Sequence, residues 1–286
     1  MNLNFWIIQT FNGISYGALL FLLGSGLSLI FGVMRIVNLA HGSYFMLGGY
    51  VALSVIWTTG SWVLAIPVAA MTIALLGLAM ERIFLRPLGF DPLRQVLLTV
   101  GFAFLFQQAA LDIWTGNNFD INPPAVLTQS VVIGGVYLPL YRAFMIAIAL
   151  AIGLVLWLVM EKTRMGAAVR ATVDDAQMAR GVGVDTSRIS MIIFGLGAFL
   201  AALGGVIGGA FLGIYPGLDF EILPLAFAVV IIGGMGSLGG AAIGALIVGL
   251  ADNFGKALFP EISYFTLYAP MALILAVKPT GLFGRE

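Results

Sequence analysis

The stretch from Ile7 to Phe31, IIQTFNGISYGALLFLLGSGLSLIF, contains no Asp, Glu, Lys or Arg. A helix needs about 20 mostly apolar residues to cross a hydrocarbon core roughly 30 Å thick, and this stretch is longer than that. It shows no strand-length alternation of polar and apolar residues, so it does not fit a β-barrel. Because lipid offers no partner for unpaired backbone groups, the stretch is predicted to be a membrane-spanning α-helix.

Similar apolar runs follow along the chain. The clearest are Trp62–Met80, Val96–Trp114, Ala143–Met160, Ile189–Leu212, Ala241–Leu258 and Phe265–Val277, and two shorter or interrupted ones are Val37–Trp57 and Ile222–Gly234. The 286 residues are 61% hydrophobic and 9% charged, whereas soluble domains carry about 25% charged residues. We therefore expect an all-α, polytopic transmembrane bundle of about eight to ten membrane segments, forming a single domain over residues 1–286.

Basic residues are distributed unevenly among the loops. A nine-crossing arrangement places most of them on one side: Arg35, Arg82, Arg86, Arg94, Lys162, Arg164, Arg170, Arg180, Arg188, Lys278 and Arg285. Only Arg142 and Lys256 fall on the other side. The positive-inside rule makes the basic side cytoplasmic, with the N-terminus outside and the C-terminus in the cytoplasm. The segment from Met1 to Gln9 has no basic residue and no cleavage pattern follows, so the first helix is expected to be retained.

Two loops are long. The loop at residues 116–141 is rich in Asn, Pro and Gly and is expected outside, with a short hairpin at Ser130–Leu138. It would cap a pore, contact a partner or be a plain surface loop. The loop at residues 161–188 is the most polar part of the chain and is cytoplasmic by charge. Ala167–Ala179 is expected to form one short helix that Gly181 and Gly183 end, serving either as a partner surface or as a solvated connector.

Glycine clusters within the apolar runs. The chain has 37 glycines, and small residues let helix backbones approach closely in lipid. The densest cluster, Gly233 to Gly240, follows an apolar run of only about a dozen residues after Pro224, which predicts a broken or half-crossing element. A tight cytoplasmic turn between two helices is the alternative. Gly233, Gly234 and Gly236 are candidate pathway or gate residues.

A second candidate gate is the polar patch formed by Arg35, Asn38 and His41, near the predicted cytoplasmic boundary. Ionisable residues at membrane depth are functional candidates, and the alternative is a packed, hydrogen-bonded helix start. His41 is the only histidine and the chain has no cysteine, so no metal cluster is expected.

Other charged pairs have simpler interpretations. Asp252 and Lys256 are four residues apart on one helix face and are expected to pair, with a mouth-lining role as the alternative. Asp219 and Glu221 are expected outside, where they would meet a soluble partner or be solvated.

The chain carries no recognisable chemistry or energy source of its own. One histidine and no cysteine leave no nucleophile and base constellation, so an enzyme is not expected. The nearest approach to a phosphate-binding loop, Gly255-Lys256-Ala257, has Leu250 in place of its first glycine and alanine in place of its hydroxyl residue. No coupling carboxylate is expected midway through a helix. A transporter with these properties would take its energy from another subunit, whereas a standalone channel or ion-coupled carrier for a small solute is the competing interpretation.

Four segments carry a family resemblance over essentially the whole chain. They are GLSLIFGVMRIVNLAHG at residues 26–42, RMGAAVRA at 164–171, GGMGS at 233–237 and KPTGLFG at 278–284. In this order and at this spacing, the sequence resembles the permeases of branched-chain amino acid ABC importers, the LivH-like family.

The resemblance implies a permease subunit in a bacterial inner membrane that carries branched-chain or related amino acids and binds no cofactor. The implied partners are a second, similar permease, two cytoplasmic ATPases that bind the ATP, and an extracytoplasmic solute-binding protein, with membrane lipid around the chain and no nucleic acid. The loop around residues 174–185 would be the coupling helix that docks on an ATPase. The candidate coupling residues are Arg170, Asp174, Asp175, Met178, Ala179, Gly181 and Gly183.

Overall fold

In the computed structural model, which describes residues 3–89 and 91–284, the chain is predominantly helical. The helices are α1 (Leu3–Met34), α2 (His41–Thr59), α3 (Trp62–Met80), α4 (Pro92–Trp114), α5 (Leu140–Lys162), α6 (Arg164–Asp174), α7 (Ala176–Gly181), α8 (Thr186–Leu212), α9 (Leu218–Gly233), α10 (Leu238–Leu258) and α11 (Ser263–Val277). Short turns of helix also occur at η1 (Glu81–Leu85), η2 (Arg86–Leu88) and η3 (Pro260–Ile262). Six helical segments of the described ranges are long and apolar enough to cross a membrane. The prediction of an all-α, polytopic membrane protein is confirmed.

The long apolar runs predicted from the sequence each lie within a helix. The run Trp62–Met80 coincides with α3, and the run Ile7–Phe31 lies inside the longer α1. The two shorter candidates are also helical, but their boundaries differ. α2 begins at His41 and not at Val37, because the Asn38 side chain accepts a hydrogen bond from the backbone N–H of Ala40 at 3.1 Å and holds a turn before the helix.

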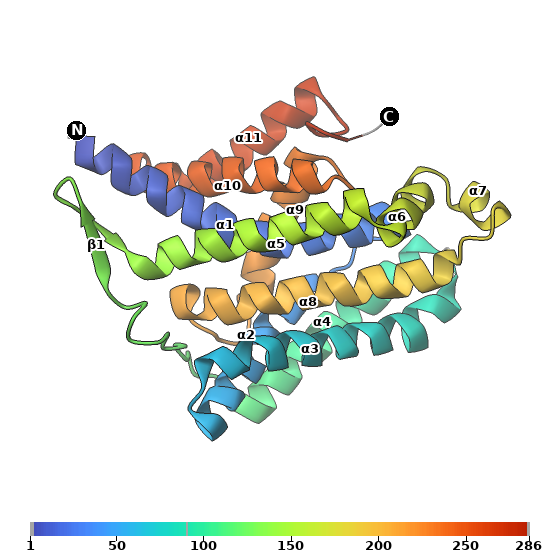
Figure 1. Ribbon diagram of the computed structural model, residues 1–286, viewed down its shortest axis with the longest axis horizontal. Coiled ribbons are helices and arrows are strands. Elements are labelled where there is room, and N and C mark those ends of the chain that lie inside the picture. Colours follow the sequence, from blue (N-terminus) through green and yellow to red (C-terminus); the bar gives the residue numbers. More distant parts are fainter. Residues whose placement is uncertain (1–2, 90, 285–286) are drawn as a thin grey trace.

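Figure 1 shows α1, α3, α5, α8 and α10 running along the long axis of the molecule. The hairpin of β1 (Ser130–Ile133) and β2 (Val136–Pro139) lies at the end where α1 begins, and α6 and α7 lie at the opposite end. α1 packs against α5, α8, α9 and α10, and 83% of its most apolar window is buried. The corresponding share is 22% for α4 and α5. α1 is therefore the central helix, whereas α4 and α5 present apolar surface that in a membrane faces lipid.

Glycines set the distance between the central helices, as expected from their clustering. A Cβ added at Gly26 of α1 would lie 2.7 Å from the carbonyl oxygen of Gly197 in α8. A Cβ at Gly205 of α8 would overlap the carbonyl oxygen of Phe45 in α2. Hydrophobic burial does not drive helix association within lipid, so this close backbone packing is a main source of cohesion.

The predicted hairpin is confirmed. β1 and β2 pair antiparallel, from Ser130 opposite Pro139 to Ile133 opposite Val136. Gly134 and Gly135 have φ of 59° and 81°, which is the left-handed backbone that a two-residue hairpin turn requires.

The prediction of one helix over Ala167–Ala179 is wrong, because the chain forms two helices, α6 and α7. Asp175 separates them with an extended backbone, and its carboxylate accepts hydrogen bonds from the backbone N–H groups of Gln177 and Met178 at 2.8 and 3.0 Å. An aspartate that caps a new helix competes with continuation of the preceding one. α7 ends at Gly181, and Gly183 follows with φ of 90°, so the predicted end of this helical region is confirmed.

Candidate functional site

The four segments that carry the family resemblance meet at the α6 end of the bundle. A Cβ at Gly32, near the end of α1, would lie 2.7 Å from the Cα of Gly236. Val169 of the second segment belongs to the same buried cluster as Leu29 and Val33 of the first. The Arg35 guanidinium lies 3.5 Å from the carbonyl oxygen of Val173, which follows the second segment in α6. The C-terminal segment completes the group, since the N–H groups of Leu282 and Phe283 donate to the carbonyl oxygens of Ile232 and Gly233 at 2.9 and 3.0 Å.

Helix α7 presents an apolar tip at this end of the molecule. Met178 is 70% exposed and Val182 is 81% exposed. The opposite side of α7 is anchored, because Ala179 is buried and its carbonyl oxygen accepts a hydrogen bond from the N–H of Val184 at 2.9 Å. Two large apolar side chains on a rigid, projecting turn suit contact with another protein.

Arg170 and Asp174 belong to α6 and hold a different position from the α7 tip. The Arg170 guanidinium contacts the carbonyl oxygen of Met160 and lies 3.8 Å from the Glu161 carboxylate, at the end of α5. Arg170 therefore ties α6 to α5. The predicted coupling residues thus fall into a group that fixes α6 and α7 and a group, represented by Met178, that faces outward.

The segment from Arg35 to Ala40 turns back into the bundle before α2 begins. Arg35 has φ of 55°, which is unusual for a residue other than glycine. His41 is fully buried, and its Nε2 lies 3.0 Å from the carbonyl oxygen of Leu23. Leu23 precedes the end of α1 by a helical distance of about 16 Å, so α2 starts well inside the bundle. The interpretation of a packed, hydrogen-bonded helix start is confirmed, and a gating role for Arg35, Asn38 and His41 stays a prediction.

The glycine-rich run forms a tight turn between α9 and α10, so the interpretation of a turn is confirmed, and a half-crossing element before it stays a prediction. Gly234 and Gly236 have φ of 97° and 81°, and the Ser237 hydroxyl caps α10 by accepting from the N–H of Gly240 at 3.0 Å. Left-handed backbone at two positions ends α9 and reverses the chain. α9 itself is 16 residues long, or about 24 Å, which is shorter than the hydrocarbon core.

Asp219 is buried within the bundle, so the prediction that it is solvated is wrong. It is 2% exposed, and its carboxylate accepts a hydrogen bond from the Ser43 hydroxyl at 2.8 Å. Gly42 allows this approach, because a Cβ there would overlap the backbone carbonyl of Asp219. The first turns of α2 and α9 therefore meet within the bundle. Pro216 and Gly217 before α9 are typical of a loop, which is why the sequence alone concealed this contact.

Two buried carboxylates lie at helix ends, so neither contradicts the expectation that no coupling carboxylate lies midway through a helix. Glu81, at the end of α3, is 2% exposed and pairs with Arg86 at 3.2 Å. By contrast, Asp219 joins none of the ion pairs between described residues. The predicted pair of Asp252 and Lys256 is confirmed at 2.8 Å.

Three of the six buried side-chain atoms without a hydrogen-bond partner in the described part of the chain lie near the starts of α2 and α9. Asn38 Nδ2, His41 Nδ1 and Asp219 Oδ1 are buried without a hydrogen-bond partner among the described residues. Buried polar groups are normally paired, and unpaired ones mark sites of strain or function. This group, which we call the α2–α9 junction, is the candidate polar site within the membrane-spanning part.

Replacing Asp219 by asparagine is expected to leave the thermal stability of the purified protein nearly unchanged, whereas alanine is expected to destabilise it by about 1–3 kcal/mol. Asparagine preserves the shape of the carboxyl group and an oxygen that can accept the Ser43 hydrogen bond, whereas alanine leaves the Ser43 hydroxyl without this partner. Thermal unfolding, monitored by size-exclusion chromatography, measures the stability of both variants. Adding Ser43→Ala to Asp219→Ala should lower the stability little further. Equal losses for asparagine and alanine would contradict a stabilising role for this hydrogen bond.

Comparisons with known proteins show to which family the chain belongs. Residues 9–275 match the family described as the branched-chain amino acid transport system permease component. The permease protein LivH of the high-affinity branched-chain amino acid transport system of Escherichia coli (strain K12) is 30% identical over 98% of this chain and 96% of its own length. Its Pseudomonas aeruginosa counterpart BraD is 27% identical over the same shares. The autoinducer 2 import system permease protein LsrC of Escherichia coli O9:H4 is 29% identical over 66% of this chain and 56% of its own length. The chain therefore belongs to the family of branched-chain amino acid transport system permease components.

Proposed function

We propose that this chain is the membrane-spanning permease subunit of an ABC importer that carries branched-chain or related amino acids across the bacterial inner membrane. The observation that carries the proposal is the convergence of all four family segments at the end of the bundle where α6 and α7 project. An external solute-binding protein would deliver the solute, and two cytoplasmic ATPases would supply the energy. A second, similar permease would complete the pathway.

The proposed orientation places α6 and α7 in the cytoplasm and the hairpin outside. α2, α9 and α11 join the six long segments as shorter crossings, which makes nine membrane segments, an odd number that puts the two termini on opposite sides. The uneven distribution of Lys and Arg supports the cytoplasmic assignment; of these residues, Arg285 lies outside the described part. Residues 161–188 are then the coupling loop and residues 116–141 the extracytoplasmic loop.

The orientation can be tested with single cysteines, because the chain has none. In right-side-out vesicles, a membrane-impermeant maleimide should label Ser130→Cys in the hairpin but not Asp185→Cys before α8. The matched control is the same labelling after detergent permeabilisation, which should reveal both sites. Labelling of Asp185→Cys alone in intact vesicles would reverse the proposed topology.

Coupling is proposed to pass through α7 and α6 to the ends of α1 and α5. Met178 would contact the ATPase, and Asp175 and Gly181 would keep α7 a separate short helix at the correct angle. Arg170, Asp174, Ala179 and Gly183 would transmit its movement to the bundle. The tie between Arg170 and Glu161 at 3.8 Å supports this role, because movement of α6 then displaces α5.

The solute pathway is proposed to pass the α2–α9 junction. Short helices that begin within the membrane are a recurrent way to place polar groups at the transport site. Asn38 and His41 would line the pathway, with Arg35 and the turn of Gly233, Gly234 and Gly236 controlling its cytoplasmic exit. Alternating access would follow when ATP closes the ATPases and α7 moves.

One observation favours the second candidate, an ion-coupled carrier or a standalone channel. Asp219 is a buried carboxyl within the membrane-spanning part, which is the kind of group that proton- or ion-driven carriers use. That candidate requires uptake by the chain alone. The ABC importer requires its partner subunits, so the two functions are separable by reconstitution.

The substrate class is tested with the complex isolated from native membranes and reconstituted into liposomes with its solute-binding protein. We expect uptake of radiolabelled leucine that unlabelled isoleucine and valine inhibit and urea does not. Inhibition by urea but not by any amino acid would contradict the proposed substrate class while leaving the permease function intact.

A further inference from the structure

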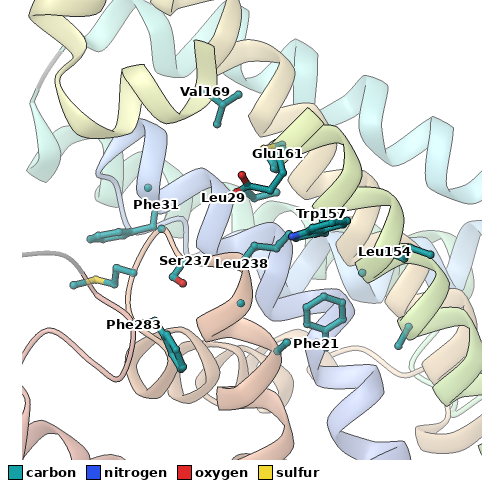
Figure 2. Close-up of a pocket in the computed structure, with 18 of the residues that line it drawn as sticks. Phe21, Leu29, Phe31, Leu154, Trp157, Glu161, Val169, Ser237, Leu238 and Phe283 are labelled. Atoms are coloured by element: carbon teal, nitrogen blue, oxygen red, sulfur yellow. The ribbon is translucent and has the colours of Figure 1, made fainter. Parts of the chain in front are cut away.

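A large groove runs along the outside of α1, between α5 and α10 (Figure 2). Its volume is about 1350 Å³. Figure 2 shows Trp157 and Leu154 of α5 on one wall, with Phe21 of α1 and Leu238 of α10 on the others. Gly153 lets α5 approach α1 closely, because a Cβ there would lie 3.2 Å from the Phe21 ring.

The apolar part of the groove is open to the outside of the helix bundle. Leu150 and Leu154 on its α5 wall are 69% and 56% exposed. The α1 wall runs from Ile14 to Gly32, a helical distance of about 27 Å, which exceeds the depth of one lipid leaflet, about 15 Å. An acyl chain that entered the groove would contact protein throughout its own leaflet.

Charged groups line only the α6 end of the groove. They are Arg35, Glu161, Arg170 and Asp174. Arg170 pairs with Glu161 at 3.8 Å, whereas Arg35 joins no ion pair between the described residues. The Arg35 guanidinium therefore offers a positive charge at the mouth of an apolar groove.

We propose that this groove binds one glycerophospholipid, with its phosphate on Arg35 and an acyl chain along the wall of Phe21, Leu154 and Trp157. A guanidinium recognises phosphate through charge-assisted hydrogen bonds, and basic pockets between membrane helices bind lipid head groups. The charged mouth matches a head group better than it matches an apolar helix from a partner.

The groove shares Arg35 and Gly236 with the proposed cytoplasmic exit of the solute pathway, but none of the residues of the α2–α9 junction. Asn38, His41 and Asp219 do not line the groove, which lies on the outer side of α1. The proposal uses the orientation above only to name the leaflet, which is the cytoplasmic one. Leu154→Trp changes no residue of the proposed solute pathway, so this variant separates loss of lipid binding from loss of solute uptake.

Native mass spectrometry of the detergent-purified complex tests the proposal with dioleoyl phosphatidylglycerol and phosphatidylethanolamine as probes. Arg35→Gln is expected to weaken retention of the tightest-bound lipid about tenfold through loss of one charge-assisted contact, and Arg35→Lys should retain most of it. Arg94→Gln is the matched control at an exposed arginine of another loop and should not change retention.

A groove-filling variant separates lipid binding from any folding defect at Arg35. Leu154→Trp should reduce retention of the same lipid, whereas Leu75→Trp, at a similarly exposed position on α3 (59%, against 56% for Leu154), should not. Unchanged retention in both Arg35→Gln and Leu154→Trp would overturn the proposal. So would displacement of the lipid by leucine, which would make the groove a solute site, or absence of saturable lipid binding in the wild-type complex, which would indicate that a partner subunit covers it.

Discussion

Replacing both Met178 and Val182 by aspartate is expected to abolish ATP-driven uptake by the assembled importer while the permease stays folded in the membrane. These side chains are 70% and 81% exposed at the tip of α7, so the change costs the isolated chain little. At a contact with an ATPase, each unpaired buried carboxylate would cost about 2 kcal/mol or more. Two of them weaken docking about a thousandfold. Co-purification of the ATPases with the permease measures this directly.

The control for this variant lies in the loop at residues 116–141. Val126 and Tyr137 are 68% and 71% exposed there, so their replacement by aspartate introduces the same charge on equally exposed apolar positions. We expect this control to co-purify the ATPases at the wild-type level. Wild-type recovery of the ATPases with the Met178 and Val182 variant as well would remove α7 from the coupling contact.

Replacing Gly205 by alanine is expected to destabilise the whole bundle. The added methyl group would overlap the backbone carbonyl of Phe45, and a backbone atom cannot move aside as the end of a side chain can. α2 would have to shift away from α8, at a cost of about 3 kcal/mol or more. The melting temperature in detergent should fall by about 10 °C.

A matched glycine exists on the lipid-facing helix α4. Gly101 lies in a helix, as Gly205 does, but it is exposed. An added Cβ at Gly101 would meet nothing within 4 Å. Gly101→Ala should leave the melting temperature unchanged or raise it slightly, because alanine favours helix over glycine by about 1 kcal/mol. Equal behaviour of the two variants would show that the close approach of α2 and α8 does not stabilise the fold.

Long helices were the most predictable part of this protein. The run Trp62–Met80 is predicted from composition and length alone, because lipid imposes one solution on an uncharged segment of that size. The hairpin was equally predictable, because Gly134-Gly135 between short apolar segments favours a two-residue hairpin turn. The pair of Asp252 and Lys256 follows from spacing on a single helix. Each of these features depends on residues close together in the sequence.

The unpredicted features depend on contacts between distant segments. Asp219 is buried where Gly42 lets α9 approach α2. The sequence of α9 by itself does not indicate that contact. The break at Asp175 reflects competition between a cap and a continuing helix, which a window of helix-forming residues does not resolve. The groove beside α1 combines residues from several helices, so it has no linear signal at all.

The central claim is that this chain provides a passage whose energy comes from hydrolysis of ATP by other subunits. The most direct measurement compares accumulation of radiolabelled leucine in liposomes containing either the purified chain alone or the complete complex with its solute-binding protein. Accumulation against a gradient should require the complex and hydrolysable ATP, with none for the chain alone at any imposed proton or sodium gradient. Sustained accumulation by the isolated chain would contradict the claim.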